Sequence, residues 1–342
     1  MYSYRSAIGS DNGNGELILR KGYIWSDYRG MIVGVTSGNV YSKGVTALGG
    51  HGIVRVAGGS LYIKGSTAVG SECIFNGLLV GEASMTKATN PTGDGIQRGE
   101  FYLSDGVVTN GTGVLLVGGA RSIGTFEQTG GVFIHNSGNN NASLVMIGLS
   151  GGRGSYLMGG GVADIRNTVY VGGCLTNAIT GAGYLSSYYP YPADRHDAEG
   201  MLMVTGGVMT CTKNFYVGAD GTGTVAVVGR EGALNITQNL VLSNTTETAT
   251  SSTLKFKLDE AGISPIKVSG KVVNTAGTKL VVDVGDTQAK RKNRRLIQCA
   301  NWEGPAITDV TFVGERAGEA SLRSDALGLY VGLSNGGTVL VR

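Results

Sequence analysis

The densest group of side chains that could contact a ligand lies in the segment 173–199. Tyrosine rings can stack on sugars or anchor a protein partner, and nearby carboxylates, an arginine and a histidine can hydrogen-bond to either. The candidate contact residues are Tyr184, Tyr188, Tyr189, Tyr191, Asp194, Arg195, His196 and Asp197. The alternative is that the tyrosines and prolines only pack this segment against the rest of the protein.

The same segment comes nearest to a catalytic arrangement. A polysaccharide lyase needs a carboxylate cluster that binds Ca²⁺ and a basic residue that takes up a proton. The candidates for these roles are Asp194, Arg195, His196, Asp197 and Glu199. The paired aspartates typical of galacturonases are missing, as are the motifs of serine hydrolases, phosphate-binding loops and HExxH metalloproteases. We expect a solvated acidic loop here, and we predict no catalytic residue, metal or cofactor.

Elsewhere, the histidines and cysteines are too scattered in the sequence to indicate a site. His51 is expected in a loop and His135 on a strand, each without a second His or Cys beside it. The four cysteines include no CxxC pair, which argues against zinc or redox chemistry. Cys211 is expected to be a buried thiol, and a bridge from it to Cys174 would require their Cα atoms to lie close together.

Charge and hydropathy exclude two classes of partner. Lys and Arg number 28 and Asp and Glu number 25, so the net charge of +3 is too small to indicate nucleic-acid binding. No apolar run reaches the ~18 residues of a membrane-spanning helix, so we expect no membrane span. The basic run at 290–295 could meet an anionic polysaccharide or a lipid head group, although such a run is usually a solvated turn.

A glycine-rich repeat must position these residues. The chain has 59 Gly and 5 Pro among 342 residues, which indicates an all-β fold with many turns. Pairs of glycines seven positions apart, each followed by a short apolar strand, begin at Gly15, Gly52, Gly99, Gly124, Gly154 and Gly200. A second marker, a short apolar strand that finishes in Val-Gly or Ile-Gly, reaches its glycine at Gly34, Gly81, Gly118, Gly148, Gly172 and Gly218.

The spacing of these glycines predicts the architecture. The shortest distance between equivalent glycines, from Gly106 to Gly131, is 25 residues. Each unit contains three short strands separated by Gly, so we predict a three-faced parallel β-solenoid (a β-helix) of about 25 residues per turn. Glycine suits the corners because the chain turns there with positive φ. We expect the repeat domain at 1–243, followed by closing coils and a C-terminal β cap at 244–342.

Alternation within the strands predicts the core. The residues two and four positions after the first glycine should point inward; they include Leu17/Leu19, Val54/Val56, Phe101/Leu103, Tyr156/Met158 and Leu202/Val204. In the following strand the inward residues should be Ile24, Leu61, Val108, Phe133, Ala163, Met209 and Leu234. Asn110, Gln128 and His135 also fall at inward positions, where we expect either a hydrogen-bonded polar ladder or a shift in register.

A second set of apolar residues lies two positions before the glycine of each Val-Gly or Ile-Gly marker. These residues should point outward. This apolar stripe consists of Ile32, Leu79, Leu116, Met146, Tyr170 and Tyr216. An exposed apolar ladder usually marks an interface; the alternative is that a long loop or the C-terminal segment covers it. The long loops 35–51, 82–98 and 173–199 should leave from the same corner of the repeat, where binding surfaces usually lie.

The N-terminal end should be open. The repeat pattern starts at Gly15 with no capping segment before it, which leaves strand edges that natural proteins normally cover. Residues 1–11 are polar and lack the apolar core of a signal peptide. We therefore expect either a preceding segment or a partner at this end.

The repeat resembles a known family. Gly118–Ile134 (GGARSIGTFEQTGGVFI) and Val217–Val228 (VGADGTGTVAVV) are similar to the autotransporter-associated β-strand repeats of large bacterial surface proteins. The resemblance covers about residues 15–243. It implies a right-handed parallel β-helix that is secreted or exposed on the cell surface.

Together, the repeat and the resemblance predict a non-catalytic extracellular module with a structural or adhesive role. It should contact copies of itself, as a homo-oligomer or filament, through the apolar stripe or the open N-terminal end. One alternative is a carbohydrate-active enzyme, a polysaccharide lyase or hydrolase similar to a tailspike depolymerase. Another is a module that binds a surface glycan through the corner loops.

Overall fold

A computed structural model describes residues 2–3, 6–10, 13–26, 30–35, 50–65, 77–82, 97–119, 122–136, 143–175, 197–242, 251–260, 262–275, 277–285 and 294–333. Within these ranges the protein is all-β, with a short 3-10 helix, η4 (Ala317–Glu319), near the C-terminal end. No helix in the described part of the chain is long and apolar enough to cross a membrane. The expectation of an all-β fold is confirmed.

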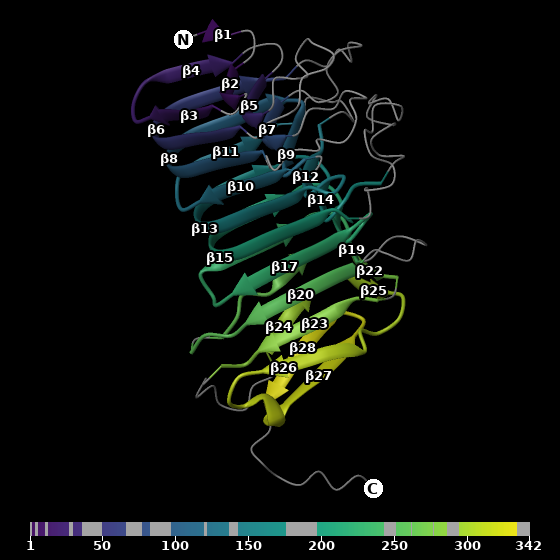
Figure 1. The fold of residues 1–342 in the computed structure, drawn as a ribbon. Helices are drawn as coiled ribbons and strands as arrows, with labels where there is room; N and C mark the ends of the chain where they lie inside the picture. The colour runs from purple at the N-terminus through teal and green to yellow at the C-terminus, as the bar shows by residue number, and fades with distance from the viewer. Residues whose placement is uncertain are drawn as a thin grey trace, which may run out of the picture.

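The strands form two sheets, and the strands of both sheets succeed one another down the length of the molecule from the N-terminus to the C-terminus (Figure 1). The first sheet contains β1 (Tyr2–Ser3), β3 (Asn14–Leu19), β4 (Tyr23–Ser26), β6 (His51–Lys64), β8 (Arg98–Thr112), β10 (Ile123–Gln128), β11 (Val132–His135), β13 (Arg153–Ile165), β15 (Glu199–Cys211), β17 (Thr222–Val228), β18 (Gly232–Ile236), β20 (Ser251–Lys257), β21 (Ile266–Val268), β23 (Lys279–Asp283), β24 (Arg294–Gln298), β26 (Asp309–Val313), β27 (Ala320–Asp325) and β28 (Gly328–Leu333). The second sheet contains β2 (Ser6–Ser10), β5 (Gly30–Val35), β7 (Gly77–Glu82), β9 (Val114–Val117), β12 (Val145–Ile147), β14 (Val169–Val171), β16 (Phe215–Val217), β19 (Leu240–Leu242), β22 (Lys271–Asn274) and β25 (Asn301–Glu303).

Parallel pairing between equivalent strands dominates both sheets. In the first sheet the glycines that open the predicted units pair with one another in a single line, Gly15–Gly52–Gly99–Gly124–Gly154–Gly200, which continues to Gly223. In the second sheet β5, β7, β9, β12, β14, β16 and β19 pair in the same sequential way. The chain therefore returns to the same place in each sheet once per sequence unit.

The predicted inward columns form the core. Among the residues predicted to point inward, Leu17 and Ile24 are half-buried and pack against the core, and the others are buried in it. Three aromatic rings of one column stack on each other, with centroid distances of 4.9 Å between Phe101 and Phe126 and 4.5 Å between Phe126 and Tyr156. The period-2 alternation therefore identified the buried face of these strands correctly.

The three polar residues predicted to point inward are buried and hydrogen-bonded. Gln128 donates from Nε2 to the carbonyl of Val162 (3.0 Å) and accepts a hydrogen bond from the hydroxyl of Tyr156 (2.8 Å). Asn110 donates from Nδ2 to the carbonyl of Val114 (2.9 Å) and lies 3.1 Å from His135 Nδ1. Because the amide donates, Nδ1 of His135 accepts, and the imidazole is neutral with its proton on Nε2. The hydrogen-bonded interpretation therefore holds for Gln128, but only in part for the other pair, because Asn110 Oδ1 and His135 Nε2 are buried without a hydrogen-bond partner.

Glycine is required where two segments of backbone approach each other closely. All six glycines of the Val-Gly and Ile-Gly markers have positive φ. At Gly118 (φ 70°) an added Cβ would overlap the carbonyl oxygen of Arg153, and the amide of Gly118 donates to the carbonyl of Val80 (2.8 Å). Gly22, in the turn between β3 and β4, also has positive φ (86°), but nothing lies within 4 Å of an added Cβ there. The first position therefore needs glycine for space, the second for backbone conformation alone.

The C-terminal part differs from the parallel stack. β28 pairs in antiparallel fashion with β24 and with β27, and Leu329 and Val331 of β28 are buried in the core. Arg294 and Arg295, predicted to belong to an irregular basic run, begin β24, and Arg295 donates to the hydroxyl of Tyr330 (2.8 Å). Antiparallel pairing with β28 therefore places the last two residues of the basic run in a strand, which their charges alone did not indicate.

The described cysteines are not bridged. Cys174, Cys211 and Cys299 are free and buried, so the bridge considered between Cys174 and Cys211 is not formed. The thiol of Cys211 is directed at backbone carbonyls, the nearest being that of Asn167 at 3.2 Å. Burial raises the pKa of this thiol to about 12, so it behaves as a small buried group, as predicted.

Candidate functional site

The predicted contact residues of the longest loop lie almost entirely outside the described residues. This holds for Tyr184, Tyr188, Tyr189, Tyr191, Asp194, Arg195 and His196. Asp197 is described and is exposed, three residues before the buried Gly200 that begins the next unit. A contact role for this loop therefore stays a prediction.

The apolar stripe is not an exposed surface. Ile32, Leu79, Leu116, Met146 and Tyr170 are at most 4% exposed, and Tyr216 is half-buried with its ring stacked on that of Tyr170 at 4.7 Å. They form a second apolar cluster with Val114, Leu144, Leu149, Cys174, Leu175 and Ala219, separate from the main core. The expected exposure of the apolar stripe is therefore wrong, and the alternative that other parts of the chain cover it fits this burial. Alternation within a strand cannot distinguish the two.

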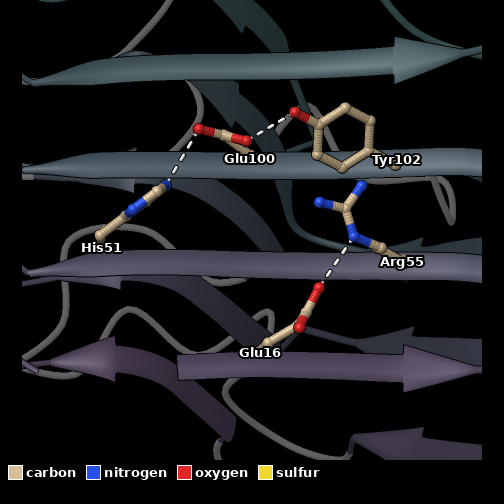
Figure 2. Close-up of polar contacts among 5 residues, drawn as sticks. All are labelled: Glu16, His51, Arg55, Glu100 and Tyr102. Carbon is tan, nitrogen blue, oxygen red and sulfur yellow. Dashed lines mark hydrogen bonds and ion pairs between the residues drawn. The ribbon is translucent and has the colours of Figure 1, made fainter. Parts of the chain in front are cut away.

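Chemistry-bearing side chains instead meet on the outer face of the first sheet, near its N-terminal end. β3, β6, β8 and β10 lie side by side there, and their alternate residues point away from the core. Figure 2 shows five of these side chains, Glu16 from β3, His51 and Arg55 from β6, and Glu100 and Tyr102 from β8. We call these five residues the outer-face cluster. Residues far apart in the sequence thus share one surface.

One half of the outer-face cluster is centred on Glu100. One carboxylate oxygen, Oε1, lies 2.9 Å from His51 Nε2, and the other, Oε2, accepts a hydrogen bond from the hydroxyl of Tyr102 at 2.5 Å (Figure 2). His51 is the first residue of β6, so the prediction that it lies in a loop is wrong. The strand begins one residue before Gly52, earlier than the glycine marker indicated.

The other half of the cluster is centred on Arg55. Its Nε donates to Glu16 Oε1 at 2.8 Å, and its guanidinium lies over the ring of Tyr102, 4.4 Å from the centroid (Figure 2). An ion pair and a cation–π contact therefore hold the plane of the guanidinium in place from two sides. The terminal nitrogens of Arg55 make no hydrogen bond to any described residue.

These contacts shift the pKa values of the cluster. The hydrogen bond to Glu100, assisted by burial, raises the pKa of Tyr102 to about 12. Burial tends to raise the pKa of Glu100, but the hydrogen bonds from Tyr102 and His51 outweigh it and lower that pKa. At neutral pH the phenol is therefore protonated and the carboxylate ionised. Neither of these two groups has a pKa close to the value that suits proton transfer at that pH.

The cluster borders an open depression of about 280 Å³. Its apolar surface comes from Ile18 and Ala57, and Ser104 and Thr129 contribute hydroxyl groups. Arg20, Arg55 and Glu127 supply the charged groups. No described residue forms a hydrogen bond or an ion pair with the side chain of Arg20 or Glu127, so both can meet a ligand.

The repeat register contained a signal for this site. Once Gly52 is aligned with Gly99, the positions three residues later place Arg55 beside Tyr102, as the structure does. Alternation with the predicted inward residues Val54/Val56 and Phe101/Leu103 places both residues on the outward side of their strands. It did not show which outward residues of adjacent strands form contacts, because that depends on aligning units separated by insertions of different length.

Comparison with known proteins does not assign the chain to a family. No protein-family model, no curated protein and no solved structure matches the chain. Within the described residues, no group of three or more His, Cys, Asp or Glu side chains is placed to hold a metal ion. The functional argument therefore depends on the architecture and on the outer face of the first sheet.

The hydrogen bond between Tyr102 and Glu100 can be tested by titration. In the wild-type protein the Tyr102 phenol should remain protonated at pH 11, because ionising it would place a second negative charge beside the carboxylate. In Glu100→Gln its pKa should fall towards the usual ~10. NMR of ¹³Cζ-labelled tyrosine, with Tyr102→Phe to assign the signal, measures both. Glu127→Gln, which removes a more weakly coupled carboxylate, is the control; equal titration curves in the wild type and Glu100→Gln would contradict the assignment.

Proposed function

We propose that this chain is a right-handed parallel β-helix with three faces per turn, and that it serves as a non-catalytic structural or adhesive module outside the cell. The observation that supports the architecture best is the single line of paired glycines from Gly15 to Gly200. Equivalent points of successive sequence units are stacked there, as the rungs of a β-solenoid would be. The extracellular location rests on the similarity to autotransporter-associated β-strand repeats.

The outer surface fits a module that makes contacts better than one that performs catalysis. A glycosidase needs two carboxyl groups about 5–10 Å apart across a bound sugar. In the outer-face cluster, Glu16 and Glu100 are both engaged by neighbouring side chains, and Tyr102 holds its proton firmly. The stacked parallel strands offer an extended surface instead, which suits repeated weak contacts.

Contact with a second copy would use the N-terminal end. Within the described residues, β1 pairs with β4, β2 with β5 and β3 with β6, each on one side only. Ile8, Leu17 and Ile24 are half-buried at this end, whereas their column partners Val33, Val54 and Leu61 are buried. Edge strands and incompletely covered core residues favour the addition of further β-structure. The apolar stripe, being buried, is not part of this proposal.

A paired adhesion and turnover assay tests the function. Beads that carry the full chain should be retained on at least one of three surfaces, coated with polysaccharide, with protein or with the same chain. The soluble chain, incubated with the same polysaccharides, should release neither reducing ends nor unsaturated sugars. Beads that carry heat-unfolded chain are the control. Release of product would replace the proposal with an enzymatic function, and retention no better than the control would refute the adhesive role.

A further inference from the structure

We propose that the depression beside the outer-face cluster binds one uncharged sugar unit of a glycan chain. The inference rests on the proposed adhesive function and names its ligand. The proposed contact lies on the outer face of the first sheet and not in the corner loops. Three properties of the residues that line the depression support it: their charge, their hydrogen-bonding groups and their fixed geometry.

The charges favour a neutral ligand. Arg20 and Arg55 contribute two positive charges, and Glu127 together with Glu16, the ion-pair partner of Arg55, contributes two negative ones. A carboxylated or sulfated sugar would meet Glu127, and a cationic ligand would meet Arg20. An uncharged polyol avoids both repulsions, because its hydroxyls both donate and accept hydrogen bonds.

The hydrogen-bonding groups are complementary to hydroxyls. The side chain of Arg20 and the terminal nitrogens of Arg55 can donate, and the carboxylate of Glu127 accepts. Ser104 and Thr129 carry hydroxyls that can do either. Hydrogen bonds to charged groups are the stronger kind, so a sugar with adjacent hydroxyls could bridge the arginines and the glutamate.

Part of the site is already ordered before a ligand arrives. Glu16 and the ring of Tyr102 hold the guanidinium of Arg55, and Glu100 in turn holds the hydroxyl of Tyr102 (Figure 2). Ordering an arginine side chain on binding would otherwise cost free energy. The fixed guanidinium presents its unused nitrogens without that cost.

Apolar surface is available for the C–H face of a sugar ring. Ile18 is 46% exposed beside the depression, and Ala57 is a small residue that leaves space between larger neighbours. A volume of about 280 Å³ that is open to solvent suits a single ring. Such a shallow site binds weakly, and adhesion would then depend on many chains acting together on a repeating glycan.

Ligand-observed NMR with defined oligosaccharides tests the inference. The probes are uncharged trisaccharides of glucose, mannose and galactose, with a galacturonate trisaccharide as the anionic comparison. At least one uncharged probe should receive saturation from the wild-type chain. Arg20→Ala and Glu127→Gln should each weaken that binding about tenfold, the expected loss of a hydrogen bond to a charged group.

Arg153→Ala is the matched control, since Arg153 is an exposed arginine of β13 that pairs with Glu199 and does not line the depression. It should bind like the wild type, and all variants should keep the wild-type circular dichroism spectrum. Binding unaffected by Arg20→Ala and Glu127→Gln would overturn this site. Tighter binding of the galacturonate probe would overturn the choice of a neutral ligand. Bead retention without binding of any uncharged probe would overturn the inference and leave the adhesive function standing.

Discussion

Gly118→Ala is expected to destabilise the protein by about 4 kcal/mol or more, a loss that single substitutions rarely cause. The new methyl group would overlap the carbonyl oxygen of Arg153 in strand β13, and the residue would also be held at positive φ. Neither the backbone of Arg153 nor that of Gly154 can move away without breaking the ladder between β10 and β13. Urea unfolding followed by circular dichroism measures the loss.

Gly22→Ala is the matched control for this substitution. Gly22 also has positive φ, but an added Cβ would meet nothing within 4 Å. Its cost should be limited to the strain of the left-handed conformation, about 1 kcal/mol. The difference between the two variants therefore isolates the close approach of the backbone. Similar losses in both would show that backbone conformation, and not space, explains why glycine recurs at these positions of the sequence.

The second large effect is a dependence of stability on pH that arises from His135. Burial lowers the pKa of His135 to about 4, and the backbone of Ser143 opposes this only in part. In the unfolded chain the pKa returns to about 6.5. Between pH 4 and pH 6.5, His135 is therefore protonated in the unfolded state but not in the folded state. The free energy of unfolding should be highest above pH 6.5 and fall by about 3 kcal/mol as the pH drops to 4.

The double variant Asn110→Ile/His135→Ile should abolish this dependence. Asn110 and His135 lie in one inward column between Ile63 and Ile165, so isoleucine is already the residue at both neighbouring positions. Replacing both partners of a buried hydrogen bond by apolar groups of suitable shape can be close to neutral. Urea titrations at several pH values between 7.5 and 4.5 give the slope. His51→Gln, on the outer face, should retain it; an unchanged slope in the double variant would show that another group is responsible.

The sequence predicted the core of this protein more completely than its surface. Period-2 alternation after each glycine pair identified the buried columns, such as Val54, Phe101 and Leu202, because a strand with one face in the core must alternate. The same reasoning placed Ile32 and Leu116 outside the main core, where the structure has them in a separate apolar cluster. It could not show that they are buried, because nothing local in a strand indicates whether its outer side is covered.

The candidate site was less predictable for a different reason. Arg55 and Tyr102 are 47 residues apart, and His51 and Glu100 are 49 apart. Each pair is brought together only by the register between β6 and β8. The insertions between units hide that register from a simple reading of spacing. Candidate residues such as Tyr188, in the longest insertion, could be identified because they lie close together in the sequence. The residues of the outer-face cluster lie close together only in the folded protein.

Strictly sequential pairing also bears on how such a molecule could change in evolution. β9, β12 and β14 bond only to their immediate neighbours in the second sheet, and their inward valines and isoleucine occupy equivalent positions. Removing or duplicating one complete unit would bring together surfaces that already fit, because no described hydrogen bond between these strands skips a neighbour. The length of the molecule could therefore change by whole units while the residues at its two ends stay the same.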